Sequence, residues 1–377
     1  MKTVKVGIAG TRGLSTLKGF QSIEGVEISA MCDLDEDHLN EAADKIGVKN
    51  RYRVFEDMLE SDIDAVVIAT PMQCHVPQAI AALEAGKHIM SEVTAGVTID
   101  ELFWLCECVE KYKKVYMYAE NYIYTPQVQL VKSLVERGFF GETYYAEGMY
   151  MHNTSNLLIY PNGKTSWRTY WQDGVRGNFY PTHSIGPVMQ WFPDDRIKEI
   201  TTFSPGVRHP YGVKQDSGTT TMCRTEKGNL INIRTDCTSP HPHNMDYYHL
   251  QGTNGAFRSK THNSDLDRVS FVGDGNPSYS MKWQALEDYN EYLPERYKLA
   301  QSDELSAGHG GGDFFIVKDF VDAVRGEKPP AIDVYTACEW TAVGLLSGLS
   351  VTNNSKTLEV PCFRPEMPLE EKRIILS

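Results

Sequence analysis

The chain has 377 residues, of which 41% are hydrophobic and 23% are charged, a balance typical of a globular protein and a length suited to two domains. Its 50 acidic and 37 basic residues leave a formal net charge of −13, which argues against non-specific binding to nucleic acid or to an anionic membrane. The sequence also lacks the run of roughly 18 apolar residues that a membrane-spanning helix needs.

Eight cysteines are too dilute for a disulfide framework, and they lack the spacing of a zinc site, so we expect reduced thiols. His241-Pro-His243 is a possible metal pair, but no further ligand lies at a suitable spacing, so we expect a solvated loop and no bound metal. The first residues lead directly into a strand without the apolar segment of a secretory signal, and we therefore expect a cytoplasmic protein.

The first third of the chain alternates short apolar segments with helical ones. The expected strands are residues 4–9, 26–33, 65–70, 88–91 and 115–119. The expected helices are residues 36–46, 55–60, 76–84 and 99–113. This alternation indicates βαβ units in a doubly wound parallel sheet of the Rossmann type, which we assign to a domain of residues 1–125.

Segments with β character dominate the rest of the chain. The expected strands are residues 144–152, 197–203, 218–224, 230–237 and 247–252, and the expected helices are residues 128–137, 314–325 and 336–349. We therefore expect residues 126–377 to form an α+β domain, in which the last two helices cover an antiparallel sheet. Residues 260–312 are rich in polar and turn residues and are expected to be a long loop system.

A glycine-containing turn after the first strand predicts a dinucleotide site. Gly10 and Gly13, with Thr11 and Arg12 between them, offer small residues and backbone N–H groups to a pyrophosphate, although a strict GxGxxG motif would need glycine at positions 12 and 15. Asp33 ends the second expected strand, where a carboxylate accepts hydrogen bonds from the ribose hydroxyls of NAD and repels the 2′-phosphate of NADP. We therefore expect NAD in preference to NADP.

Residues 64–93 resemble the Gfo/Idh/MocA family of glucose–fructose oxidoreductases and inositol dehydrogenases. The motifs that carry the resemblance are Thr70-Pro71, His75, the ALEAGKH segment at 82–88 and Glu92. The resemblance extends over nearly the whole chain and implies NAD(P)-dependent redox chemistry on sugars, cyclitols and glycosides. It also implies a large open C-terminal sheet that pairs subunits into a homo-oligomer, and cofactor contacts from Thr70, Pro71, His75, Glu92 and Asn121.

Two positions depart from the family pattern. Val93 stands where the family usually has a lysine that helps to remove the hydroxyl proton during hydride transfer. Phe179 stands where the common dehydrogenases have an aspartate, four residues before a histidine that is His183 in this chain. Two proton-handling groups of the usual sugar dehydrogenase are therefore missing.

The motifs around these departures resemble a narrower branch of the family. This branch contains NAD-dependent glycosidases of the α-N-acetylgalactosaminidase type and enzymes that oxidise the 3-hydroxyl of glycosides before deglycosylation. The resemblance places four rings around the sugar: Tyr150, His152, Tyr180 and His183. It also places His309, from a Gly-His-Gly-Gly loop, at the substrate, and we add Trp167 and Arg168 as candidate residues of the pocket wall.

Hydride transfer from a carbinol needs a base for the hydroxyl proton, and a histidine with a pKa near 6.5 accepts one at pH 7. We expect an NAD-dependent oxidoreductase that acts on the C3 hydroxyl of a sugar or glycoside, with His183 as the base, Tyr180 assisting, and Tyr150 and His152 as an orienting or second acid–base pair. Two alternatives stay open. One is a glycoside hydrolase that uses NAD catalytically, and the other is a non-catalytic sugar-binding protein.

Overall fold

The computed structural model describes residues 3–262, 264–273, 281–300 and 311–365, without the side chains of Arg12, Leu14, Ser15 and Leu17. The described chain separates into two compact units. Residues 3–124, 311–338 and 362–365 form the first unit, and residues 125–300 and 339–361 form the second, with the gaps just given. These units describe packing, and the division into folding domains 1–125 and 126–377 stays a prediction.

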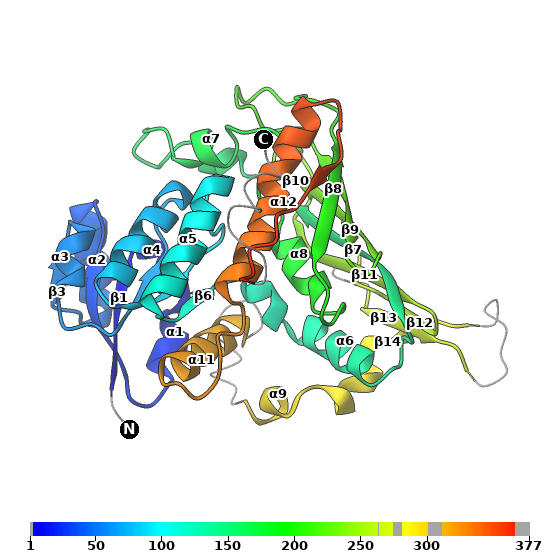
Figure 1. Ribbon diagram of the computed structural model, residues 1–377, viewed down its shortest axis with the longest axis horizontal. Coiled ribbons are helices and arrows are strands. Elements are labelled where there is room, and N and C mark those ends of the chain that lie inside the picture. Colours follow the sequence, from blue (N-terminus) through cyan, green and yellow to red (C-terminus); the bar gives the residue numbers. More distant parts are fainter. Residues whose placement is uncertain (1–2, 263, 274–280, 301–310, 366–377) are drawn as a thin grey trace. The chain divides into compact units, whose positions relative to one another are not determined.

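The first unit contains a six-stranded parallel sheet (Figure 1). Its strand order is β3 (Asn50–Tyr52), β2 (Val26–Cys32), β1 (Val4–Ala9), β4 (Ala65–Ile68), β5 (His88–Ser91) and β6 (Tyr116–Tyr118). The chain runs outward from β1 in one direction and from β4 in the other, so right-handed crossovers place helices on both faces. All four residues of β4 are buried, as expected of a strand covered on both sides. The Rossmann-type prediction is confirmed.

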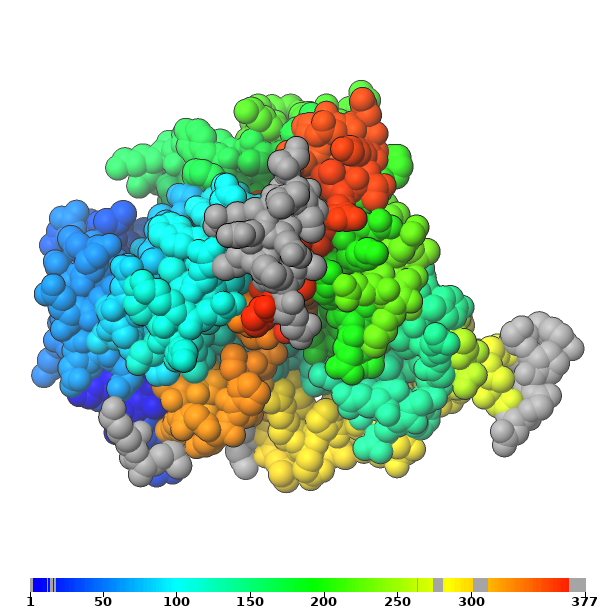
Figure 2. Space-filling model, in the orientation of Figure 1, coloured from blue at the N-terminus to red at the C-terminus, as the bar shows by residue number. Residues whose placement is uncertain are grey.

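The helices of the first unit begin and end at recognisable signals. They are α1 (Leu17–Gln21), α2 (Glu36–Ile46), α3 (Phe55–Leu59), α4 (His75–Glu84), α5 (Ile99–Tyr112) and α11 (Gly312–Val324), with the 3₁₀ helices η1 (Thr11–Thr16), η2 (Met72–Cys74) and η3 (Asn121–Tyr124). Thr98 and Glu101 form a capping box at the start of α5, and Gly47 ends α2 in the left-handed conformation. Helices α4 and α5 form much of the surface of this unit in Figure 2.

The second unit is built on a nine-stranded mixed sheet. The order is β14 (Gln284–Ala285), β13 (Arg268–Phe271), β12 (Gly255–Arg258), β11 (Asn244–Gly252), β7 (Thr143–Met151), β10 (Leu230–Asp236), β9 (Thr219–Thr225), β8 (Ile197–Phe203) and β15 (Leu358–Glu359). The sheet is largely antiparallel, as expected, with one exception at its centre, where β7 and β10 pair in parallel. Strands β13 and β14 lie within residues 260–312, which were expected to be a loop system. The sequence did not indicate them because these strands are short and have little apolar periodicity.

One face of this sheet is buried and the other is partly exposed. Residues of β10 and β11 alternate between buried and half-exposed positions, which is the pattern of a sheet covered on one side. Helix α8 (Thr182–Met189) packs on β7 and β11, and Gly148 allows this approach, since an added Cβ would lie 2.8 Å from the Cβ of Ser184. No helix was expected at α8, whose sequence contains Gly186 and Pro187.

The late helices differ from the expectation that both cover this sheet. Helix α11 packs against α1 in the first unit. Helix α12 (Val334–Thr352) begins in the first unit, and its later part contacts β8 through a hydrogen bond from Thr202 N to Ser350 Oγ of 3.0 Å. The remaining helices of the second unit are α6 (Pro126–Glu136), α7 (Arg168–Trp171) and α9 (Glu295–Leu299), with η4 (Ser155–Leu157) and η6 (Leu286–Tyr292).

The eight cysteines are all free thiols, as expected. None of the helices in the described part of the chain combines the length and the apolar character that crossing a bilayer requires.

Candidate functional site

Five of the predicted cofactor residues follow strands of the parallel sheet in the first unit. Gly10, Asp33 and Glu92 come directly after β1, β2 and β5, and Thr70 and Asn121 lie within three residues of the ends of β4 and β6. The carboxyl ends of parallel strands meet at the same edge of a sheet, so these residues gather along one edge. This edge is where α/β sheets of this kind bind nucleotides.

The turn after β1 depends on its two glycines. Gly10 has a φ of +87°, and an added Cβ would lie 2.6 Å from the carbonyl oxygen of Ala69. At Gly13 an added Cβ would lie 2.7 Å from a methyl group of Ile8 on β1. These are the roles of the first and third glycines of a dinucleotide-binding turn, namely a tight turn and close helix–strand packing.

Asp33 is tied to this turn. Its two carboxylate oxygens accept hydrogen bonds from the backbone N–H groups of Thr11 (2.9 Å) and Asp35 (3.0 Å). Each oxygen keeps a second lone pair, so the carboxylate can still accept from the hydroxyls of a ribose. The donor set and the glycine turn therefore suit a dinucleotide with an unmodified ribose.

His75 anchors the neighbouring turn. Its buried ring lies 2.8 Å from the Thr70 carbonyl oxygen through Nε2 and 2.7 Å from the Thr94 carbonyl oxygen through Nδ1. Burial lowers the pKa of His75, and in its neutral form the ring donates to one of these two carbonyls at a time. Thr70 is also held by its hydroxyl, which donates to Gln78 Oε1 at 2.6 Å. Pro71 follows Thr70 as the N-cap of η2.

The end of β6 carries an acidic residue that was not among the predicted site residues. Glu120 is fully buried and accepts the backbone N–H of Tyr122 at 3.2 Å. The next residue, Asn121, donates its amide to Asp313 Oδ1 of α11 at 2.9 Å. A glutamate at the end of a parallel strand is a candidate site residue, but its burial cannot be read from the sequence before the end of the strand is known.

The second unit brings together all four rings that were predicted to surround the sugar. The Tyr150 hydroxyl lies 2.8 Å from His152 Nδ1. The Tyr150 ring centroid lies 5.3 Å from that of His183 and 5.9 Å from that of Tyr180. The Tyr180 and His183 centroids are 5.1 Å apart. We call Tyr150, His152, Tyr180 and His183 the ring cluster.

Strand alternation and one helix contact build the ring cluster. Tyr150 lies on the buried face of β7, the same side as Gly148 and its contact with Ser184 of α8. His183 is the second residue of α8, and its carbonyl oxygen accepts the hydroxyl of the buried Tyr248 at 2.8 Å. The close packing of α8 on β7 therefore sets Tyr150 beside His183.

His243 adds a fifth ring that the sequence analysis did not place in the site. Its ring centroid lies 4.7 Å from that of His152, in an edge-to-face arrangement. His243 is exposed, and it precedes β11, the strand that pairs with β7. Among the described residues, no group of three or more His, Cys, Asp or Glu side chains is arranged to hold a metal.

The other predicted substrate residues lie at α7. The Arg168 guanidinium stacks 4.5 Å from the Trp167 ring centroid and donates to the Gln172 side chain. Nearby, Asp173 is buried and accepts the Thr154 hydroxyl at 3.0 and 3.1 Å, and burial raises its pKa to about 6.

Two departures from the family pattern are buried apolar side chains. Val93 is 6% exposed and Phe179 is 7% exposed, so neither position offers a proton-transferring group. His309 and the side chain of Arg12 lie outside the described residues.

Two family models match the chain. Residues 124–366 match the C-terminal domain of glycosyl hydrolase 109, and residues 4–120 match the NAD-binding Rossmann fold of the oxidoreductase family. Residues 4–120 are therefore an NAD-binding Rossmann domain.

Curated relatives cover nearly the whole chain. A glycosyl hydrolase family 109 protein of Shewanella pealeana is 33% identical over 96% of this chain and 86% of the relative. An α-N-acetylgalactosaminidase of Shewanella oneidensis is 31% identical over 96% of this chain and 85% of the relative.

Solved structures share the fold at lower identity. Levoglucosan dehydrogenase in complex with NADH has a TM-score of 0.78 at 22% identity, covering 96% of this chain and all of the other. Scyllo-inositol dehydrogenase of Lactobacillus casei with NAD(H) and scyllo-inositol has a TM-score of 0.72 at 18% identity, covering 95% of this chain and 99% of the other.

Proposed function

Because the chain belongs to glycosyl hydrolase family 109 and carries an NAD-binding Rossmann domain, we propose that it cleaves glycosides through a transient, NAD-dependent oxidation of a ring hydroxyl at C3. The observation that carries this proposal is the ring cluster, which lies in the part of the chain that matches the hydrolase domain. Val93 and Phe179 support it as well, because the lysine and aspartate of a common sugar dehydrogenase are replaced by buried apolar groups.

Gly10, Gly13 and Asp33 would hold the dinucleotide, with Thr11, Arg12, Thr70, Pro71, His75, Glu92 and Asn121 as further candidate contacts or supports. NAD, when bound there, would supply the hydride acceptor for a transient oxidation at C3 and the hydride donor for the return to the alcohol. The Asp33 carboxylate favours the ribose of NAD over the 2′-phosphate of NADP through charge repulsion.

His183 is the proposed base for the C3 hydroxyl proton. A neutral imidazole has one nitrogen that can accept the hydroxyl proton when the C3–H bond breaks and return it when the ketone is reduced. The centroid of the Tyr180 ring lies 5.1 Å from that of His183, and Tyr180 is the proposed residue that orients the hydroxyl.

Tyr150 and His152 form the proposed second acid–base pair. A ketone at C3 makes the C2 proton acidic, and removal of that proton expels the C1 substituent and leaves a C1–C2 double bond. Water then adds at C1, C2 regains a proton, and reduction at C3 completes a net hydrolysis. The bond of 2.8 Å between the Tyr150 hydroxyl and His152 Nδ1 links a phenol to an imidazole, as such proton shuttling requires.

The relatives suggest a first substrate to test. An α-N-acetylgalactosaminidase is among them, so an aryl α-N-acetylgalactosaminide is the first probe, within a panel of aryl glycosides of other sugars. Arg168, Trp167 and His309 are the proposed further contacts to the substrate.

One assay follows aglycone release and NADH absorbance together, with and without added NAD. The proposal expects aglycone release without net NADH. Stoichiometric NADH with a keto product would show a dehydrogenase, and neither signal from a protein that binds NAD would show a non-catalytic sugar-binding protein.

We also propose a cytoplasmic homo-oligomer. Free cysteines are the state that a reducing compartment maintains. The half-exposed face of the nine-stranded sheet carries Tyr145, Glu147 and Met149 on β7, and it offers a broad surface to a second copy. Light scattering on a Met149→Arg variant should show dissociation, whereas Leu299→Arg, at an exposed position of α9, should leave the assembly unchanged. An unchanged mass for Met149→Arg would contradict this assignment.

A further inference from the structure

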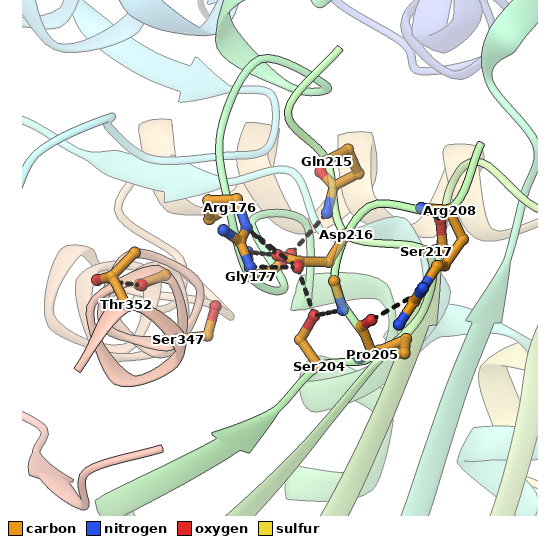
Figure 3. A network of polar contacts seen from close by, with 12 residues as sticks. Arg176, Gly177, Ser204, Pro205, Arg208, Gln215, Asp216, Ser217, Ser347 and Thr352 are labelled. Atoms are coloured by element: carbon orange, nitrogen blue, oxygen red, sulfur yellow. Dashed lines mark hydrogen bonds and ion pairs between the residues drawn. The ribbon is translucent and has the colours of Figure 1, made fainter. Parts of the chain in front are cut away.

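The segment that leads from α7 to the ring cluster is held by two adjacent buried residues. Gln215 and Asp216 lie in the loop between β8 and β9 (Figure 3), and both side chains are buried. Gln215 contacts both ends of residues 173–177. Its backbone N–H donates to the Asp173 carbonyl at 2.8 Å, and its side-chain amide donates to the Gly177 carbonyl at 2.6 Å.

Asp216 holds the same segment through charge. Its carboxylate is fully buried and accepts Nε and Nη2 of Arg176 at 3.0 and 2.8 Å. It also accepts the backbone N–H of Gly177 at 2.6 Å and the hydroxyl of Ser204. A carboxylate that meets a guanidinium in two-point geometry has a defined orientation as well as a strong interaction.

The backbone of Gly177 has no room to move toward the later part of α12. Gly177 has a φ of +82°, and an added Cβ would lie 2.5 Å from the backbone nitrogen of Gly348. The next residue, Asn178, donates its backbone N–H to Ser347 Oγ at 2.7 Å. The N–H and the carbonyl of Gly177 and the N–H of Asn178 are therefore all bonded to side chains from other segments.

We propose that Gln215 and Asp216 are positioning residues of the candidate site, and that they set Tyr180 and His183 against Tyr150 by fixing residues 173–178. Tyr180 is three residues past Gly177, and His183 lies in the first turn of α8. Loss of one of the hydrogen bonds that Gln215 or Asp216 makes to residues 173–178 would shift the residues that lead into Tyr180 and His183. Small displacements of reacting groups have large effects on rate. The effect on turnover rests on the proposed function, whereas the effect on the positions of Tyr180 and His183 does not.

The test uses Gln215→Met, which removes the side-chain donor to Gly177 and keeps the backbone bond to Asp173. The matched control is Ser217→Ala in the same loop. The Ser217 hydroxyl accepts a hydrogen bond from the backbone N–H of Arg208, which also lies in this loop, so the variant leaves the bonds to residues 173–178 in place. For Gln215→Met we expect kcat to fall about 10- to 100-fold while the KM for NAD stays unchanged, and for Ser217→Ala we expect wild-type values.

A second readout is independent of turnover. The Cε1–H signal of His183, identified by its loss in His183→Gln, is followed by proton NMR as the pH is varied. We expect its chemical shift and midpoint to change in Gln215→Met and to stay unchanged in Ser217→Ala, because only the first variant alters the rings around His183.

The outcomes separate the two claims. If the wild-type protein shows no activity but the His183 signal still changes in Gln215→Met, the proposed function is overturned and the positioning role is kept. A folded Gln215→Met protein with wild-type kcat and an unchanged His183 signal would overturn the positioning role. If Gln215→Met fails to fold, Arg176→Lys carries the test, since it keeps the charge beside Asp216 but loses the two-point fork, and the same two readouts must move.

Discussion

The dinucleotide edge of the first unit and the ring cluster of the second are built by different rules. At the dinucleotide edge, Gly10, Asp33 and Glu92 each follow a parallel strand directly, so topology alone gathers them. In the ring cluster, Tyr150 and His183 come from a strand and a helix that meet only because α8 packs on β7 at Gly148.

The ring cluster depends more on long-range packing than the dinucleotide edge does. A strand end keeps its place as long as the sheet forms, whereas the ring cluster also needs the loop contacts of Gln215 and Asp216. We therefore expect substitutions at the dinucleotide edge to change cofactor affinity, and substitutions in or behind the ring cluster to change turnover.

The largest expected effect belongs to His183. Removing the proposed base by His183→Ala should lower kcat by about 10²- to 10⁴-fold while leaving the KM for NAD close to that of the wild type. Steady-state kinetics with an aryl glycoside that the wild-type protein cleaves measure both values. His262→Ala, at an exposed histidine, serves as the control. Full activity in His183→Ala would remove this residue from the mechanism.

At the dinucleotide edge the matching change is Asp33→Ala. It removes a charged acceptor of ribose hydroxyls, so NAD affinity should fall about 10- to 100-fold, and discrimination against NADP should shrink. Titration calorimetry with each cofactor gives the two affinities, and Asp37→Ala in the exposed first turn of α2 is the control. Equal affinities for NAD in the wild type and Asp33→Ala would contradict the assignment.

The stability of the ring-cluster scaffold should depend on Asp173. Burial raises the pKa of Asp173 to about 6, so the folded protein binds this proton more tightly than the unfolded chain does. Stability from this group is therefore greatest below the unfolded pKa and falls as the pH rises toward 6, by up to roughly 3 kcal/mol.

Asp173→Asn removes this titration and keeps an acceptor for the Thr154 hydroxyl. Urea unfolding at pH 4 and pH 8 should show that the variant gains stability relative to the wild type at the higher pH. A constant difference between the two proteins across this range would show that Asp173 titrates normally.

The smallest expected effect concerns His243. Its ring lies against His152 and is exposed, so we expect His243→Ala to lower kcat by only about 2- to 10-fold, less than the loss of a full acid–base residue. His241→Ala, two residues earlier in the same exposed loop, should leave kcat unchanged. If the two variants behave alike, His243 does not act on the ring cluster.

The sequence predicted the dinucleotide edge more completely than the ring cluster. A buried strand such as residues 65–68 has a clear apolar signal, and the residues after it follow from the parallel topology. The four rings were identified through a family resemblance, because Tyr150 and His183 meet only through the packing of α8 on β7, which no local pattern in the sequence indicates.

Other features left no local signal at all. Helix α8 contains Gly186 and Pro187, which favour a turn in the sequence, and its packing on β7 overrides that tendency. The Asp216 anchor lies in a loop whose composition is ordinary, and its role depends on the burial of the carboxylate and the place of Arg176.

The central claim is that a substrate C–H bond at C3 is broken and remade with NAD during cleavage. The most direct measurement compares aglycone release from an aryl glycoside carrying deuterium at C3 with release from the unlabelled compound, and analyses the sugar formed in D₂O. We expect slower release from the labelled compound and deuterium at C2 of the product. Equal rates, no deuterium at C2 and undiminished release from protein stripped of NAD would contradict the account.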